Sequence, residues 1–546
     1  MDTDVLIVGA GPTGLMLANQ LVRRGVRALI IDRHAGPSRE TKALGVQARS
    51  LEIYAQLGII ERALELGTPS HGAYLWARGR KMAHVPIGQA GKDLTPYPYI
   101  LILGQDANER IMGEKLRDSG LSVQWNTELT GLEQPPGHVA VTLRQGDGTV
   151  RNLTAAWVAG CDGARSAVRE LNRITFPGAP YEHVFFVADV EVKGSMVPAE
   201  VNVYLWRDGF HLFFPMKGQD HWRIVGILPR ALRGRQDVDF EAVIPSVRGE
   251  AGASLEFKSC AWFSTYRIHH RAASHFRAGR CFVLGDAAHV HSPVGAQGMN
   301  TGLQDAYNLA WKLALVVAGQ ADEKLLESYE GERLPVAQRL LSTTDRGFKL
   351  AVSDSWIAGL LRTEVVSRIA AFAMRRERIQ RVAFRLVSQT GIHYRNSALS
   401  QELMQPKGEA PRAGDRFPWL RLRLDPNGPV QDLFQKLDDT RFNLFVIGQA
   451  LEAESLRQWG NLVRCHLIPA DPANAAELRR AQIPQPSFYL VRPDGYVGLC
   501  GARLDPMAIE RYMSARIHVV SASLAAASAV PAISAQRSLA VVPSTC

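Results

Sequence analysis

The opening of the chain limits its fold more than any other stretch. Residues 3–8 (TDVLIV) are a short apolar run, GAGPTG follows, and apolar residues then recur at helical spacing to about Arg24. Residues 27–31 (RALII) form a second apolar run, which ends at Asp32. The pattern predicts a strand, a helix and a second strand, the first unit of a parallel α/β sheet.

The glycines of this first turn have the spacing G-x-G-x-x-G, at Gly9, Gly11 and Gly14. The first permits a tight turn, the second lets a pyrophosphate approach the backbone, and the third allows close packing of helix on strand. The helix N-terminus adds N–H groups and the positive end of its dipole. Asp32, with Arg33 beside it, is placed to bind a ribose hydroxyl. We therefore predict a dinucleotide site, with a merely tight turn as the alternative.

A second glycine-rich stretch follows a buried strand at residues 281–284 (CFVL). The strand ends at Gly285-Asp286, where a carboxylate can accept hydrogen bonds from a polyol. The backbone N–H groups of residues 293–300 precede a helix and can face an electron-rich ring. A flavin needs such donors to stabilise its reduced anion. The predicted contacts in this stretch are Asp286, Pro293, Gly295, Gly298, Met299 and Asn300.

Together these motifs resemble those of the single-component (class A) FAD-dependent aromatic hydroxylases, which include phenol hydroxylase and pentachlorophenol hydroxylase. Residues 285–300 match the G-D-A-A-H signature of that family and the glycine-rich segment after it. Cys161-Asp162-Gly163 matches its C-D-G stretch. The resemblance covers residues 1–345 and implies FAD as the cofactor, with Asp162 and Gly163 contributing to FAD and nicotinamide binding.

Further contacts are implied only by this resemblance. Gln105 resembles a glutamine that contacts the flavin side chain, and the loop from Lys42 to Gln47 resembles a stretch that passes along the FAD. The family often has arginine near Lys42, and lysine keeps the charge without the planar fork. Some relatives place a catalytic histidine in this loop, but Leu44 stands near that place.

The expected fold class is α/β, with a Rossmann-like FAD-binding domain built from residues 1–180 and 271–395. Helical spacing recurs over 48–66, 105–119 and 300–345. Residues 181–270 alternate with period two and are rich in aromatic residues, which predicts an inserted antiparallel sheet that binds substrate. We expect short strands within residues 71–103 to join this sheet.

A third unit follows a change of composition near residue 400. Residues 400–515 predict a small α/β domain, and FYLVRPDGYVGLCG resembles the late strand and turn of the thioredoxin-like domain in the phenol hydroxylase branch. It has no CxxC pair, so thiol–disulfide chemistry is not expected, and Cys500 is interpreted as a buried thiol. Residues 520–546 are rich in Ala and Ser and are expected to be disordered.

The substrate wall is left with two alternatives. Side chains of residues 210–215 alternate, so Phe214 lies on one face while His211 and Phe213 lie on the other. The pattern does not say which face meets the flavin. Phe213, Phe214 and Pro293 are therefore the candidate substrate-lining residues, and His211 and Tyr204 the candidate catalytic residues.

The same strands favour a phenolic or neutral ring over a benzoate. Benzoate hydroxylases carry an arginine for the substrate carboxylate, but Met216 stands at about that place and no arginine occurs between residues 208 and 222. A buried carboxylate without a partner would be strongly disfavoured.

Composition excludes several other classes of protein. The six Cys are scattered, and His289 and His291 have no matching carboxylate or Cys spacing, so no metal is expected. The net charge of +10 is spread along the chain, which favours a solvated surface over a nucleic-acid partner. The acidic start and the lack of an apolar run of about 18 residues predict neither a signal peptide nor a membrane span. We expect a cytoplasmic protein.

We therefore predict a monooxygenase that hydroxylates a small aromatic substrate, using FAD, NADPH or NADH, and O2. By the resemblance, oxygen transfer passes through a flavin hydroperoxide. One alternative is a related enzyme that acts on a polycyclic or antibiotic substrate. An alternative from another class is a non-catalytic flavin- or nucleotide-binding protein. The state of assembly is left open, with a homodimer as one alternative.

Overall fold

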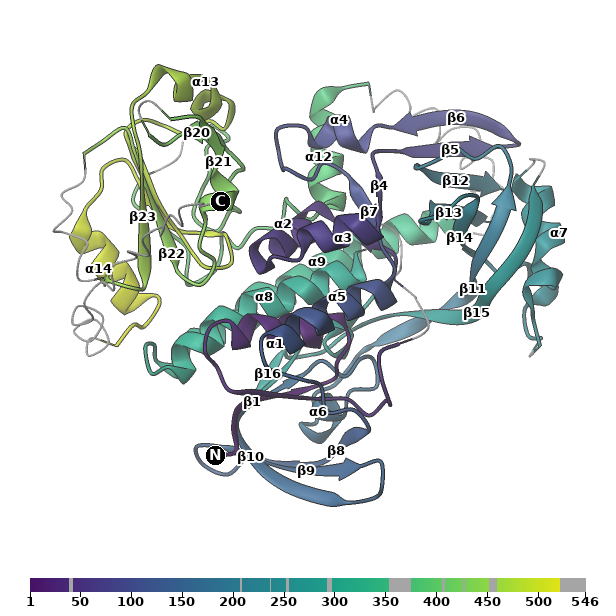
Figure 1. The fold of residues 1–546 in the computed structure, drawn as a ribbon, viewed down its shortest axis with the longest axis horizontal. Helices are drawn as coiled ribbons and strands as arrows, with labels where there is room; N and C mark the ends of the chain where they lie inside the picture. Colours follow the sequence, from purple (N-terminus) through teal and green to yellow (C-terminus); the bar gives the residue numbers. More distant parts are fainter. Residues whose placement is uncertain are drawn as a thin grey trace, which may run out of the picture.

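The structure is a computed structural model that describes residues 1–38, 43–206, 209–235, 237–251, 255–291, 297–352, 375–404, 408–425, 428–450 and 459–520. These residues form a mixed α/β fold in which three large sheets surround a layer of helices (Figure 1). Within the described residues, every helix is too short or too polar to cross a bilayer.

The first sheet confirms the predicted strand–helix–strand opening. Its strands follow the order β16-β17-β10-β1-β2, and β1 pairs in parallel with both β2 and β10. The strands are β1 (Thr3–Val8), β2 (Ala28–Ile31), β10 (Val150–Gly160), β16 (Arg277–Ala278) and β17 (Cys281–Val283), and β9 (Val139–Gln145) and β8 (Thr127–Glu133) extend the sheet from β10. Helix α1 (Pro12–Val22) connects β1 to β2.

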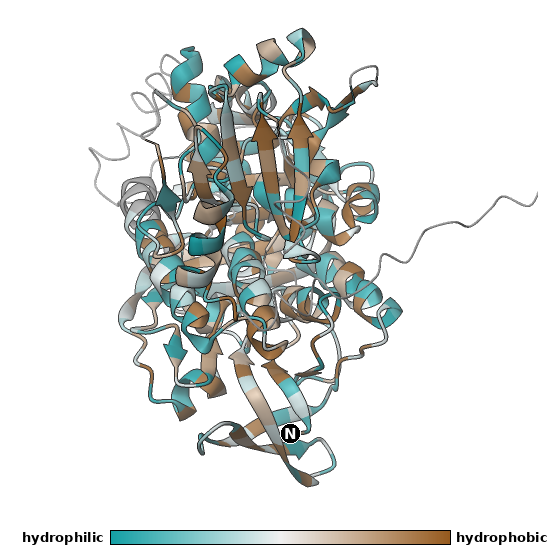
Figure 2. Cartoon of the chain, turned by 90° about the vertical axis from the view of Figure 1, so that its left-hand side faces the viewer, coloured by the Kyte–Doolittle hydropathy of each residue, from teal (hydrophilic) through white to brown (hydrophobic). Residues whose placement is uncertain are grey.

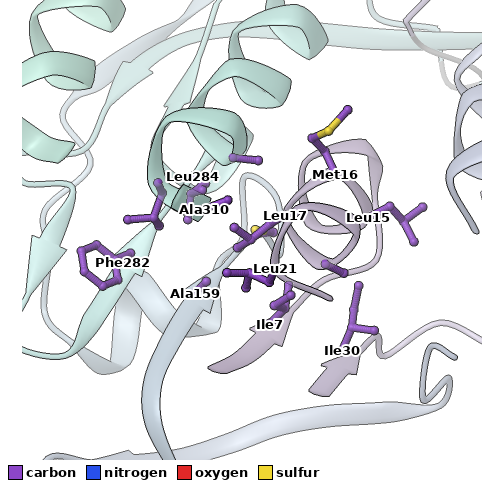
Figure 3. Close-up of a cluster of buried hydrophobic side chains, with 14 of the residues drawn as sticks. Ile7, Leu15, Met16, Leu17, Leu21, Ile30, Ala159, Phe282, Leu284 and Ala310 are labelled. Carbon is purple, nitrogen blue, oxygen red and sulfur yellow. The ribbon is translucent and has the colours of Figure 1, made fainter. Parts of the chain in front are cut away.

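Apolar side chains on α1 hold this helix against the sheet. Leu17 and Leu21 are fully buried and lie beside Ile7 and Ala159 of the strands (Figure 3). The strand β1 is buried along almost its whole length, which is why it reads as a continuous apolar run rather than an alternation.

Several helices pack against the first sheet, and two of them, α5 and α8, begin at predicted cofactor contacts. They are α2 (Ala48–Leu57), α3 (Ile60–Leu66), α5 (Gln105–Asp118), α8 (Gly298–Val317) and α9 (Glu327–Val352). The expected helix over 48–66 is in fact two, because Gly58 ends α2 in the left-handed conformation. The expected helix over 300–345 is likewise divided between α8 and α9, by a turn at Gly319 and a short 3-10 helix.

The second sheet contains eight strands in the order β18-β15-β11-β14-β13-β12-β5-β6. They are β5 (Ala73–Ala77), β6 (Arg80–Val85), β11 (Gly178–Lys193), β12 (Val201–Trp206), β13 (Gly209–Pro215), β14 (His221–Ile227), β15 (Glu256–Ala272) and β18 (His289–Val290). Because β5 pairs with β12, residues from the 71–103 segment belong to this sheet.

The two faces of the second sheet have different neighbours. The back face, with Phe213 and Ile224, packs against helix α7 (Phe240–Ala251) in one apolar cluster. The front face, with Leu212 and Val225, forms a separate cluster that includes Leu44 of the first domain. The front face therefore looks toward the glycine-rich loops.

A smaller sheet lies in the C-terminal part, with the order β19-β25-β24-β22-β23. Its elements are β19 (Gln401–Glu402), β22 (Phe442–Ile447), β23 (Val463–Ile468), β24 (Ser487–Val491), β25 (Val497–Gly501), α13 (Pro472–Arg480) and α14 (Pro506–Ala515). Figure 2 views the molecule from the side of this unit and shows hydrophobic residues along its strands. Trp311 of α8 packs in the core of this unit, so α8 lies between the two sheets.

A buried network of charges joins the C-terminal unit to α8 and α9. The Arg492 guanidinium contacts Glu332 at 2.5 Å and 3.0 Å and also donates to Asp494. Lys312 lies 2.9 Å from the same glutamate. Burial would raise the pKa of Glu332, but Arg492 and Lys312 outweigh it and hold that pKa far below its ordinary value.

Candidate active site

A groove of about 970 Å³ lies at the carboxyl ends of β1, β2 and β10. The chain runs from β1 to β2 on one side, while β10 pairs on the other side of β1. This edge is therefore a switch point, where open α/β sheets bind ligands. The groove is lined by the first glycine turn, residues 32–38 and residues 161–165.

The three glycines of the first turn have different surroundings. Gly9 has φ +103°, and a Cβ there would lie 2.3 Å from the carbonyl oxygen of Cys161. A Cβ on Gly14 would lie 1.9 Å from the carbonyl oxygen of Gly9. A Cβ on Gly11 would meet no atom within 4 Å. Gly9 and Gly14 therefore serve the fold, while Gly11 leaves space for a ligand above the N-terminus of α1.

Two acidic residues, Asp32 and Glu109, line the groove. Asp32 accepts a hydrogen bond from the N–H of Ala10 at 2.7 Å, and the exposed Arg33 follows it. Glu109 also lines the groove and accepts from the side chain of Gln105 at 2.8 Å. Burial raises the pKa of Glu109, and the charge of Asp32 adds to this effect. Sequence analysis missed Glu109; its position four residues after Gln105 on one helix could have indicated it.

The C-D-G stretch follows β10, so the sheet places Asp162 and Gly163 in the groove. Asp162 accepts from the N–H of Val168 at 3.2 Å, and burial raises its pKa. The guanidinium of Arg169 donates to the carbonyl oxygens of Ala164 and Ala287 at 2.8 Å and 2.9 Å. This arginine therefore ties the C-D-G loop to the Gly285-Asp286 turn.

A second cavity of about 510 Å³ lies between the glycine-rich loops and the front face of the second sheet. It shares five lining residues with the groove: Gly11, Gln105, Cys161, Gly163 and Ala164. The two spaces are therefore continuous. An elongated dinucleotide fits this arrangement, with its nucleoside end in the groove and its ring end toward the sheet. The residues present fit FAD.

The Gly285-Asp286 turn places the exposed Asp286 on the wall of this cavity. Asp305 of α8 holds the turn, since its Oδ2 accepts from the N–H of Gly285 at 3.0 Å and lies 2.8 Å from Nε2 of His289. Arg333 contacts the other oxygen at 2.6 Å. Burial would raise the pKa of Asp305, but Arg333 and His289 lower it. His289 therefore holds this turn in place. The sequence analysis did not select Asp305.

Some residues at the start of α8 line the cavity, and others hold a neighbouring loop in place. Gly298 and Met299 line the cavity. Asn300 is fully buried and accepts from the N–H of Gln47 at 2.9 Å while donating to the carbonyl oxygen of Gly45 at 2.8 Å. The Asn300 side chain therefore holds the 43–47 loop in place through Gly45 and Gln47. The predicted residues Lys42, Pro293 and Gly295 lie outside the described residues.

The cavity decides which face of the second sheet is the wall. Leu212, Phe214, Val225 and Tyr266 line it, and burial raises the pKa of Tyr266. Among the two candidate phenylalanines, only Phe214 lies on this wall. Phe213 is fully buried on the back face.

The two catalytic candidates also lie on the back face, which corrects the sequence analysis. Tyr204 stacks on Trp76 with ring centroids 5.3 Å apart. His211 is fully buried, and its Nε2 lies 2.6 Å from the carboxylate of Glu250 on α7. The period of two sends both side chains under α7, so neither reaches the cavity. Each has a structural role in joining the sheet to its helix.

Three residues of β15 reach the cavity that sequence analysis did not select, Tyr266, Arg267 and His269. The segment 208–222 indeed supplies no arginine, but a distant strand does. The second sheet brings β15 beside β11 rather than beside the segment that was searched. In the described part of the chain, no three His, Cys, Asp or Glu side chains gather as metal ligands would.

The fold and the joined cavities define a dinucleotide-binding protein of the flavoprotein type, and comparisons show its family. Residues 2–344 match the family described as FAD binding domain. The chain is 33% identical over 517 residues to 6-methylpretetramide 4-monooxygenase of Streptomyces rimosus, covering 91% of each. It is 32% identical over 500 residues to pentachlorophenol 4-monooxygenase of Sphingobium chlorophenolicum, covering 90% of this chain and 86% of that protein.

A solved structure agrees with this result. OxyS anhydrotetracycline hydroxylase from Streptomyces rimosus superposes with a TM-score of 0.76 at 28% identity, covering 95% of this chain and 99% of that one. The chain belongs to the family of FAD-dependent aromatic monooxygenases, and it is an enzyme.

Asp286→Ala is expected to weaken FAD binding by about 1–3 kcal/mol, because a ligand hydroxyl would lose its acceptor. Titration of the FAD-depleted protein with FAD, followed by flavin fluorescence, measures the change. Asp118→Ala removes another exposed carboxylate, at the end of α5 and outside both cavities, and should leave the affinity unchanged. Equal affinities in the two variants would contradict a role for Asp286.

Proposed function

We propose that this protein uses NADPH or NADH and O2 to hydroxylate an aromatic ring that binds in the cavity beside the flavin site. One observation carries the proposal: the cavity opens into the dinucleotide groove on one side and ends at an apolar wall on the other. When bound, FAD would supply the electron transfer to oxygen and the delivery of one oxygen atom to the ring.

The residues that would hold FAD follow the length of the joined cavities. Gly11, Asp32 and Arg33 would hold the nucleoside and pyrophosphate, on the turn that Gly9 and Gly14 shape. Gln105, Asp162, Gly163, Asp286, Gly298 and Met299 would hold the remainder. Lys42, Pro293 and Gly295 stay proposals from the sequence, and Asn300 and Gln47 would act by positioning the loop.

The wall would bind and orient the ring. Leu212, Phe214 and Val225 present apolar surface, and burying such surface contributes about 25 cal/mol per Å². The Tyr266 hydroxyl makes no hydrogen bond to any described residue, and its raised pKa keeps it protonated. Tyr266 could therefore donate a hydrogen bond to an oxygen on the ring.

Two sizes of substrate remain under this proposal. A phenol is supported by the resemblance to pentachlorophenol 4-monooxygenase, and a polycyclic ring system by the resemblance to 6-methylpretetramide 4-monooxygenase. Purified protein would be tested against a panel of phenols and polycyclic phenols for ring-stimulated NADPH and NADH oxidation, with identification of the product. A yellow protein that oxidises neither nicotinamide with any ring would instead support the non-catalytic alternative.

The phenylalanine pair tests the choice of wall. Phe214→Ala is expected to raise the Michaelis constant for the ring about tenfold and to lower the ratio of product to nicotinamide oxidised, because the ring loses a packing surface. Phe213→Ala should mainly lower stability, by about 3–5 kcal/mol, because it opens a cavity under α7. Steady-state coupling and urea unfolding of both variants measure this, and the reverse pattern would place the substrate on the back face.

We further propose that residues 1–180 and 271–395 form the FAD domain, 181–270 the substrate sheet, and 400–515 a thioredoxin-like domain. The C-terminal sheet supports this, since two parallel strands are followed by two antiparallel ones. Cys500 is buried, and burial raises its thiol pKa to about 12, so a role in packing is favoured over thiol exchange.

A further inference from the structure

Arg267 lies on β15 of the second sheet. It lines the cavity and is exposed. Its side chain makes no ion pair and no hydrogen bond with any residue that the structure describes. An exposed guanidinium on a cavity wall has donors available to a ligand, and a ligand that enters the cavity displaces water from them.

Two neighbours of Arg267 on β15 bring further hydrogen-bond donors to the cavity. His269 lies two residues further along β15 and also lines the cavity, and the protonated Tyr266 precedes Arg267. The lining residues Leu212 and Val225 are apolar, and their side chains offer no acceptor. Among the described residues that line the cavity, Asp286 is the single carboxylate, and it belongs to the turn that would hold FAD.

We propose that Arg267, assisted by His269, binds an anionic oxygen carried by the ring substrate, such as a phenolate, an enolate or a carboxylate. This inference rests on the proposed function, because it assigns the substrate to the same cavity. It keeps the expected phenolic ring but removes the ground for disfavouring a benzoate, since that ground considered only residues 208–222.

The ionised form of a phenol is also the form that an electrophilic oxygen atom attacks most readily. A positive charge close to a phenol favours its ionised state and lowers its pKa. Arg267 would thus both hold the ring in one orientation and increase the fraction of substrate that can react. It would be a specificity-determining residue that touches substrate.

The phosphate groups of a nicotinamide dinucleotide could supply an anionic oxygen as well, so the experiment must separate the two sources. The probes are pentachlorophenol, which is ionised at pH 8, and pentachlorobenzene, a neutral ring of similar shape. Both are titrated into the FAD-loaded enzyme, followed by the change in flavin absorbance and checked by equilibrium dialysis. The Michaelis constants for NADPH and NADH are measured in parallel.

Arg267→Gln is expected to weaken pentachlorophenol binding at least about tenfold while changing pentachlorobenzene binding less than about twofold. Arg267→Lys should recover part of the loss, because it keeps the charge. The control is Lys258→Gln, which removes one positive charge from the same strand at a position outside the cavity. The control should bind both rings like wild type.

Two results would overturn the proposal. Equal weakening of the charged and neutral rings would show a loss of packing instead of a lost ion contact. A rise in the Michaelis constant for NADPH or NADH, with ring binding unchanged, would assign Arg267 to the dinucleotide phosphate. In both cases the enzyme would still bind FAD and hydroxylate a ring, so the proposed function would stand. Failure of wild type to bind FAD or to oxidise any ring would instead contradict that function.

Discussion

Gly11→Ala is expected to weaken FAD binding at least about a hundredfold while the protein stays as stable as wild type. The reason lies in the direction of the added methyl group. A Cβ on Gly11 meets no protein atom within 4 Å and projects into the space shared by the groove and the cavity. The backbone at Gly11 has φ −72°, which alanine adopts without strain. The methyl group therefore affects only a ligand that approaches the turn.

The comparison with Gly9 makes this test specific. Gly9→Ala places a methyl group 2.3 Å from a backbone oxygen at a positive φ, so it should lower stability as well as FAD binding. Gly113→Ala, in α5, is the control for FAD affinity, because its added Cβ also meets no atom within 4 Å and the site lies outside both cavities, while its stability should rise by up to about 1 kcal/mol. Urea unfolding and FAD titration of the three variants give both quantities. Wild-type FAD affinity in Gly11→Ala would mean that no pyrophosphate lies against this turn.

Arg492→Met is expected to lower the free energy of unfolding by roughly 3–5 kcal/mol. The guanidinium is fully buried and contacts both Glu332 and Asp494. Removal leaves two buried carboxylates with fewer partners, and buried charges without partners are costly. Because Glu332 lies on α9 and Arg492 at the end of β24, the change should also loosen the C-terminal unit from the helices.

Arg511→Met supplies the matched control for this loss. Arg511 also pairs with an aspartate in the C-terminal unit, but the side chains of Arg511 and Asp505 are 68% and 49% exposed. Solvent weakens such a pair, so the control should change stability by about 1 kcal/mol or less. Urea unfolding of both variants, followed by circular dichroism, measures the difference. A small effect in Arg492→Met would mean that the buried network adds nothing to stability.

The pH dependence of this difference has a defined sign. The native pKa of Glu332 lies below its ordinary value of 4.5. A carboxylate of this kind contributes stability above its unfolded pKa and loses the contribution as the pH falls toward the native pKa. The gap between wild type and Arg492→Met should therefore be full at neutral pH and begin to shrink below about pH 4.5.

Local patterns predicted several of the segments that line the groove and the cavity. Gly9, Gly11 and Gly14 lie within a few residues of one strand and one helix, so their spacing alone places them at one turn. Asp286 was predicted in the same way, because it follows a buried strand, and Asp162 was predicted from the resemblance of its C-D-G stretch. The ends of neighbouring parallel strands meet at one edge, and the sheet brings these three motifs together there.

The substrate half was not predictable in the same way. An alternating strand shows that Phe213 and Phe214 point to opposite sides, but it does not show that α7 covers the side of Phe213. His211 points to the same covered side, where its Nε2 contacts the carboxylate of Glu250 on α7. Arg267 was passed over because the search considered the segment near Met216, while the wall also draws on β15.

The sequence by itself determined the strand–helix–strand opening, the nucleotide motifs, and the membership of the family that they indicate. These features depend on residues close together in the chain, whose backbone conformation follows from their own chemistry. Only the tertiary structure decided which face of the second sheet meets the cavity, which buried charges join the C-terminal unit to the helices, and which arginine lines the cavity. Those outcomes depend on contacts between β15, α7 and α8, elements far apart in the chain, whose packing no local pattern encodes.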